Sequence, residues 1–192
     1  PETEELIEWI VEESKNLKIQ QPNNLNILDI GTGSGCIPIS LKKELPNAEV
    51  FTIDVSEKAL EMARKNAVDN EVEVNFMLKN ILETDSLVEK YDVIVSNPPY
   101  VRNLEKQEIK KNVLAYEPHL ALFVEDSDAL LFYRKIAQLA LTSLTPNGKL
   151  FFEINQYLGK ETVALLENLG FKNIELRKDF VGNDRMICCE AP

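Results

Sequence analysis

The sequence predicts an α/β domain built around a mostly parallel β-sheet. Short apolar runs alternate with longer segments of helical periodicity along most of the 192 residues. Three glycines at alternate positions separate the first apolar run from the helix-like segment that follows it. Near the C-terminus, two strand-like runs follow each other with no helix between them. The expected fold therefore has right-handed crossovers and ends in an antiparallel pair of strands.

In the first half of the chain, apolar residues at helical spacing predict an amphipathic opening helix from Pro1 to about Leu17. Pro38 is compatible with the next helix because it falls in the first turn. Ser56 is a favourable N-cap for the helix after it. The expected order is strand 25–31, helix 36–45, strand 48–54, helix 56–70, strand 72–78 and strand 91–97.

In the second half, Arg102 to Glu125 is irregular and rich in charge, which predicts a lid or binding loop. A long helix is expected after it, capped by Ser127. The turn "TPNG" then leads into the fifth strand. The remaining order is helix 127–144, strand 149–155, helix 158–169, strand 171–177 and strand 186–190, which makes seven strands in all.

Composition and charge argue against a membrane-spanning protein, a secreted protein and a protein that binds nucleic acid over a broad surface. The chain is 44% hydrophobic, which suits one domain with a single core, and it has neither an apolar run of membrane-spanning length nor a secretory signal. It begins with Pro1 instead of Met, which favours a fragment with a segment missing upstream. A formal net charge of −11 disfavours broad binding to a phosphate backbone.

The cysteines do not form a metal motif. Cys36 stands alone, Cys188 and Cys189 are adjacent, and the only histidine, His119, is distant from all three in sequence. No metal site is predicted. The adjacent pair is expected in a strand, with its side chains on opposite faces and reduced in a cytosol.

The stretch "LDIGTGSGC" is typical of a cofactor-binding turn between a strand and a helix. Glycine permits positive φ and lets a ligand approach the backbone. The second strand ends on Asp54, whose carboxylate can accept both hydroxyls of a ribose. Because the pattern is G-x-G-x-G, with Cys36 where dinucleotide enzymes have a third glycine, a ligand without phosphates is favoured, with S-adenosylmethionine the obvious one. The residues expected to hold it are Gly31, Thr32, Gly33, Ser34, Gly35, Asp54, Asn80, Ile81 and Asn97.

The fourth strand ends in "NPPY", which is Asn97, Pro98, Pro99 and Tyr100. The prolines fix φ and supply no N–H, so the Pro98 carbonyl is left to accept a hydrogen bond. Together with the Asn97 side-chain oxygen it offers two acceptors to a planar –NH2 group, which positions the nitrogen for in-line methyl transfer. Tyr100 would wall the pocket. The catalytic residues are predicted to be these four.

Five stretches, "LDIGTGSGC", "TIDVSEKAL", "VSNPPYV", "YEPHLALF" and "GNDRM", in this order, resemble the HemK/PrmC family of protein-(glutamine-N5) methyltransferases. The resemblance covers essentially the whole chain. It implies a Rossmann-like class I S-adenosylmethionine-dependent fold, one catalytic domain over residues 1–192, and absence of the family's small N-terminal helical domain. It also implies a cytoplasmic enzyme whose partner and substrate is a peptide-chain release factor, methylated on the glutamine of its Gly-Gly-Gln motif.

One departure from the family pattern lies in the adenine contact, where this chain has Asn80 and Ile81 in place of the usual acid and aromatic. His119 and "GNDRM" are expected to be structural. The main alternative function is an amino-methyltransferase that acts on an adenine or guanine base, since those bases also carry planar –NH2 groups. A nucleotide-dependent oxidoreductase would need the third glycine and has no use for NPPY. A non-catalytic cofactor-binding module is a further alternative.

Overall fold

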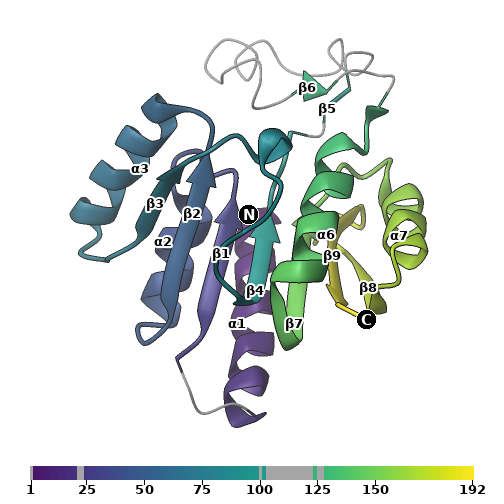
Figure 1. Ribbon diagram of the computed structural model, residues 1–192, viewed down its shortest axis with the longest axis horizontal. Coiled ribbons are helices and arrows are strands. Elements are labelled where there is room, and N and C mark those ends of the chain that lie inside the picture. Colours follow the sequence, from purple (N-terminus) through teal and green to yellow (C-terminus); the bar gives the residue numbers. More distant parts are fainter. Residues whose placement is uncertain (1, 21–23, 100, 103–122, 125–127) are drawn as a thin grey trace.

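Seven strands form one sheet in the order β3-β2-β1-β4-β7-β9-β8 (Figure 1). The computed structural model describes residues 2–20, 24–99, 101–102, 123–124 and 128–192. The strands are β1 Asn26–Ile30, β2 Glu49–Asp54, β3 Asn75–Leu78, β4 Tyr91–Ser96, β7 Leu144–Glu153, β8 Lys172–Lys178 and β9 Asp184–Glu190. The helices are α1 Glu2–Gln20, α2 Cys36–Glu44, α3 Glu57–Asp69, the short η1 Ile81–Glu83, α6 Leu131–Ser143 and α7 Gly159–Asn168.

The sheet is parallel except for β9, which runs antiparallel to both of its neighbours, β7 and β8. The predicted seven-stranded sheet with an antiparallel strand near the C-terminus is therefore confirmed. From β1 the chain builds outward through β2 to β3 and then returns to place β4 on the other side of β1. This reversal makes the carboxyl ends of β1 and β4 the switch point where open α/β sheets bind ligands.

Helices cover both faces of the sheet, so the molecule has two apolar cores (Figure 1). One core joins α1 and α2 to the sheet, and Trp9 packs edge-to-face on Phe151 at 5.5 Å between ring centroids. The other joins α6 and α7 to the opposite face, and Tyr133 packs in the same way on Phe152 at 5.2 Å. Adjacent strand residues thus serve different cores, as period-two alternation requires. Cys188 and Cys189 follow the same rule and lie in different cores, as predicted.

Two boundaries differ from the prediction. The strand β7 begins at Leu144, not at Lys149, because the "TPNG" residues interrupt a ladder that starts earlier: Tyr91 pairs with Leu144, but Val93 pairs with Lys149. The helix α6 begins at Leu131, with Leu130 and not Ser127 at its N-cap position. Ser127 itself lies outside the described residues, and so does most of the predicted lid. The described part of the lid is Arg102 in β5 (Val101–Arg102) and the two residues of β6 (Phe123–Val124), and these two short strands pair in parallel.

A largely buried ion-pair cluster ties α1 to the sheet. The Lys149 ammonium in β7 lies 2.8 Å from Glu13 of α1 and 3.0 Å from Glu190 of β9, and its side chain is 17% exposed. Burial alone would lower the pKa of Lys149, but hydrogen bonds to both carboxylates raise it overall. The amine therefore stays charged and holds two acids that would otherwise repel each other.

We expect Lys149→Met to lower the free energy of unfolding by about 2 kcal/mol, because it leaves two carboxylates facing each other away from bulk water. Urea unfolding followed by circular dichroism measures the loss. Lys58→Met, at an exposed position of α3, is the matched control and should change stability by less than about 0.5 kcal/mol. Equal stability of the two variants would contradict this account of the cluster.

Candidate active site

The carboxyl ends of β1 and β4 lie side by side at the switch point and are joined by a side-chain hydrogen bond. The two strands pair in register, with Ile30 opposite Ser96, and the buried Ser96 hydroxyl donates to the Ile30 carbonyl at 2.6 Å. The next residues on each strand are Gly31 and Asn97. A Cβ on Gly31 would stand 3.7 Å from the Asn97 backbone oxygen. Asn97 and the glycine turn, which the sequence assigns to the same cofactor site, therefore lie side by side.

The glycine turn folds back over the end of β2. The backbone N–H groups of Gly31 and Thr32 both donate to the Ile53 carbonyl, at 2.8 and 3.2 Å. All three glycines have positive φ: 95° at Gly31, 53° at Gly33 and 87° at Gly35. Nothing lies within 4 Å of the Cβ position of Gly33, so a ligand can approach the backbone there.

The third glycine has a different function from the first two. A Cβ on Gly35 would lie 2.9 Å from the Ile39 side chain and 3.1 Å from Ala63 of α3. Gly35 therefore allows α2 and α3 to pack closely behind the turn. A hydrogen bond also joins α3 to the turn: the Asn66 side-chain amide donates to the Ser34 carbonyl at 2.8 Å.

Asp54, half-buried at the end of β2, is oriented by the turn. Its Oδ2 accepts from the Gly33 N–H at 3.0 Å and its Oδ1 accepts from the Ser56 N–H at 2.8 Å. A carboxylate has about four lone-pair sites, so each oxygen keeps one for an incoming hydroxyl. The fixed acid beside open backbone at Gly33 fits the ribose of a nucleoside ligand.

Asn80 and Ile81 follow β3, one strand farther out. The Asn80 side-chain oxygen accepts from the Leu82 N–H at 3.1 Å and so caps η1. Ile81 is 7% exposed and belongs to the core on the α6 face. A shallow pocket of about 350 Å³ adjoins Asn80 and is lined by Lys79, Asn80, Glu83, Thr84, Asp85 and Ser86. Whether Asn80 and Ile81 contact an adenine ring remains a prediction.

Of the predicted catalytic residues, Asn97 and Pro99 are half-buried and Pro98 is buried at the end of β4. Tyr100 lies outside the described residues. The structure therefore brings Asn97, Gly31 to Gly35 and Asp54 to one edge of the sheet, over three adjacent strands. Within the part of the chain that the structure describes, no helix is both long and apolar enough to cross a membrane.

A buried acid under the glycine turn was not predicted. Asp29 in β1 is fully buried, and its Oδ2 accepts from the Thr52 hydroxyl at 2.6 Å. The Thr52 oxygen in turn lies 2.6 Å from the Thr32 hydroxyl in the turn. Burial raises the pKa of Asp29 to about 7, with the Thr52 bond lowering it and the charge of Asp54 raising it further. The available sequence signal was a lone acid in the apolar run "NILDI".

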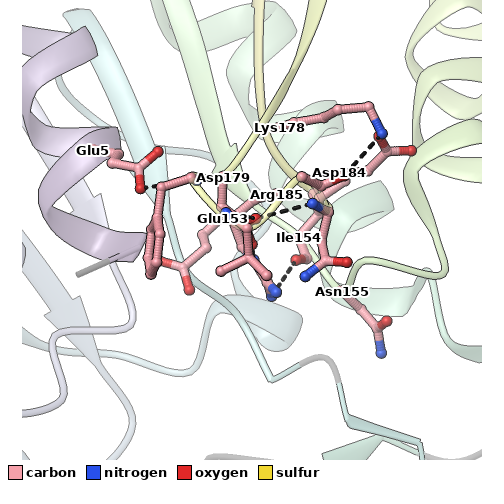
Figure 2. Close-up of polar contacts among 12 residues, drawn as sticks. Glu5, Glu153, Ile154, Asn155, Lys178, Asp179, Asp184 and Arg185 are labelled. Carbon is pink, nitrogen blue, oxygen red and sulfur yellow. Dashed lines mark hydrogen bonds and ion pairs between the residues drawn. The ribbon is translucent and has the colours of Figure 1, made fainter.

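Farther along the same edge of the sheet, beyond β4, a polar cluster joins α1, β7, β9 and the turn between β8 and β9 (Figure 2). Arg185 of β9 donates to Asp179 Oδ2 at 3.1 Å and to the Ile154 carbonyl after β7 at 3.4 Å. Glu153, 3% exposed at the end of β7, accepts from the Thr3 hydroxyl of α1 at 2.9 Å. These bonds hold the start of α1 and the turn between β8 and β9 against the strand next to β4. The "GNDRM" stretch is thus structural, as predicted.

Strand order, antiparallel β9 and the glycine turn define the class I fold of S-adenosylmethionine-dependent methyltransferases. The chain belongs to the methyltransferase small domain family, whose model matches residues 14–120. S-adenosylmethionine is the cofactor of this class, and the turn fits it: open backbone at Gly33, an oriented Asp54 carboxylate, and Cys36 in the position where the pyrophosphate-binding pattern G-x-G-x-x-G has its last glycine.

Two curated relatives carry the name release factor glutamine methyltransferase. The protein from Flavobacterium psychrophilum is 70% identical and that from Bacteroides thetaiotaomicron is 47% identical, and in each case 97% of this chain matches 65% of the relative. The chain thus spans somewhat less than two thirds of their length. Among solved structures, the ribosomal protein L11 methylase of Lactobacillus delbrueckii matches with a TM-score of 0.61 at 21% identity, over 96% of this chain and 74% of that one. That likeness supports the fold alone.

We expect the stability of the folded chain to fall as pH rises through the range in which Asp29 ionises. The pKa of Asp29 is raised in the folded state, from 3.8 to about 7, so its stabilising proton is fully present below about pH 4 and lost by about pH 7. Between pH 5 and pH 8, the unfolding free energy of the wild type should fall by about 3 kcal/mol more than that of Asp29→Asn.

Urea unfolding at the two pH values measures this difference. Asp69→Asn, at an exposed position of α3, is the control and should keep the wild-type dependence on pH. If Asp29→Asn and wild type lose the same free energy between pH 5 and pH 8, Asp29 does not titrate in this range.

Proposed function

We propose that this chain transfers a methyl group from S-adenosylmethionine to the side-chain amide of a glutamine in a protein, namely the Gly-Gly-Gln motif of a peptide-chain release factor. The observation that carries the proposal is the position of Asn97, the first residue of NPPY, directly beside the Gly31 turn at the switch point. The names of the 70% and 47% identical relatives support the choice of substrate.

The proposed chemistry depends on positioning. S-adenosylmethionine supplies an electrophilic methyl group on a sulfonium. The side-chain oxygen of Asn97 and the carbonyl of Pro98 accept the two N–H bonds of the substrate amide, which fixes the plane of the nitrogen. The same two acceptors stabilise the positive charge that develops on that nitrogen. The S–CH3 bond would break as the N–CH3 bond forms, and S-adenosylhomocysteine would leave. No strong base is needed before attack, because the N–H proton becomes acidic only as the methyl group arrives and can then be lost to water.

We propose further that residues 1–192 act as one catalytic domain, that the chain is a monomer, and that it works in the cytoplasm. The seven-stranded sheet with a continuous core on each face supports one domain. The release factor is the proposed partner. The net charge of −11 argues against a nucleic-acid substrate for the same site.

We expect the chain, mixed with S-adenosylmethionine, to methylate a release factor on the glutamine of its Gly-Gly-Gln motif and to methylate a free Gly-Gly-Gln peptide more slowly. Mass spectrometry of digests locates the added methyl group. An adenine- and guanine-containing RNA is assayed in parallel. Methylation of the RNA alone would contradict the glutamine proposal and favour an amino-methyltransferase that acts on a nucleic-acid base.

Asn97→Ala should slow methyl transfer by at least about 100-fold, because it removes one of two preorganised acceptors. The affinity for S-adenosylmethionine, measured by isothermal titration calorimetry, should change little. Asn168→Ala, at the exposed end of α7, is the control and should leave both quantities unchanged. Equal loss of transfer and of cofactor binding in Asn97→Ala would assign Asn97 to the cofactor and not to the substrate.

A further inference from the structure

Beneath the glycine turn, three side chains form a buried hydrogen-bonded chain that links β1, β2 and the turn. Asp29 and Thr52 are cross-strand partners in the register of β1 and β2. The Thr52 hydroxyl donates to Asp29 Oδ2 at 2.6 Å, and the Thr32 and Thr52 oxygens are 2.6 Å apart. Asp29 and Thr52 are fully buried and Thr32 is 4% exposed. These two hydrogen bonds therefore link the protonation state of the buried Asp29 carboxyl to Thr32, a residue of the glycine turn.

Each hydroxyl has a single proton, so the direction of the chain is fixed at both bonds. When Thr52 donates to an ionised Asp29, Thr32 must donate to Thr52, and the lone pairs of Thr32 are left for other partners. When Asp29 is protonated on Oδ2, the acid can donate to Thr52 and Thr52 donates to Thr32, so the O–H of Thr32 can donate a hydrogen bond to another partner. Protonation of Asp29 thus converts Thr32 from an inward donor to an acceptor.

A second observation marks this acid as unusual. Asp29 Oδ1 is buried and has no hydrogen-bond partner within the described ranges of the chain. A buried carboxylate oxygen without a donor is costly, and natural proteins rarely retain one without a use for it. The cost falls when the acid is protonated or when a cationic ligand binds nearby.

We infer that Asp29, Thr52 and Thr32 are positioning residues for the cofactor, and that the charge of Asp29 sets the donor direction of the hydroxyl of Thr32 in the turn that binds it. The inference rests on the proposed function, because it assumes that this turn binds S-adenosylmethionine. That ligand carries a net positive charge, so binding favours the ionised acid. Affinity should therefore rise with pH until Asp29 is ionised in the free protein.

Other charged or titratable groups share this neighbourhood. Asp54 of β2 acts on Asp29 directly. Cys36, the first residue of α2, lies within electrostatic range of Asp29, of Glu4 in α1 and of Glu153 in β7, and burial together with these acids raises the pKa of its thiol. All four groups are unchanged in variants of Thr52, so a comparison of such variants isolates the hydrogen-bonded chain.

The test measures the dissociation constant of S-adenosylmethionine by isothermal titration calorimetry from pH 5.5 to 8.5. In the wild type the constant should fall as pH rises. Thr52→Val keeps the side-chain volume but removes the hydroxyl, and should weaken binding about tenfold at pH 7. Its pH profile should also move to higher pH, because the Thr52 hydrogen bond lowers the pKa of Asp29.

Two further variants separate positioning from general loosening. Thr162→Val makes the same substitution at a fully buried threonine of α7, whose hydroxyl donates only to the Leu158 carbonyl at 2.7 Å, and should keep the wild-type constant and profile. Thr52→Ser retains the hydroxyl and should restore both values even if it lowers the melting temperature.

Each outcome decides the inference. A Thr52→Val variant with the wild-type constant and profile overturns it, and so does equal weakening in Thr52→Val and Thr162→Val. If Thr52→Val does not fold, a Thr52→Ser variant whose pH profile differs from that of the wild type also overturns the inference. Absence of binding by the wild type at every pH would instead overturn the proposed function, and the inference with it.

Discussion

The pairing of β1 with β4 is the constraint on which the rest of the site depends. These strands are separated in sequence by two other strands and their helices, yet the Ser96 hydroxyl joins the Ile30 carbonyl directly at 2.6 Å. Because the strands end together, the residues after each one must share a small space. Gly31 takes a φ of 95° at this point, a backbone conformation that residues with a side chain rarely adopt, and its Cβ position lies 3.7 Å from the Asn97 backbone oxygen. The glycine turn and Asn97 are thus brought together by strand register.

The two cores secure this arrangement from opposite sides. Phe151 and Phe152, adjacent in β7, pack against Trp9 of α1 and Tyr133 of α6. β7 also pairs with β4, so both helices act on the strand that carries Asn97. Close packing transmits displacement, because a buried aromatic side chain cannot move without moving its neighbours. The helices α1 and α6 therefore help to hold this edge of the sheet through their packing on β7.

Most of the fold could be predicted from periodicity and turn residues, because those are local properties. The seven strands, the antiparallel β9 and the place of Asn97 beside Gly31 all follow from alternating elements and one switch point. The start of β7 could not be predicted, because its ladder is interrupted by a turn-like sequence and continues across it. The hydrogen-bonded chain from Asp29 to Thr32 was also missed. Which residue of β2 faces Asp29 depends on the register of β1 with β2, and a parallel strand that is buried on both faces has no one-sided apolar pattern to set that register.

Asp29 also shows why a buried acid persists in a strand that would be more stable with an apolar residue. Above neutral pH its ionisation works against folding, since burial raises its pKa to about 7. An acid used only to hold Thr52 could be replaced by an asparagine, which would also accept the Thr52 hydrogen bond without this pH-dependent cost. What an asparagine cannot do is change charge and reverse the direction of donation along Thr52 and Thr32. The two hydroxyls are placed end to end between the acid and the turn, which is the arrangement that such a reversal requires. The cost in stability and the geometry of the chain therefore point to the same role for Asp29 in the cofactor turn.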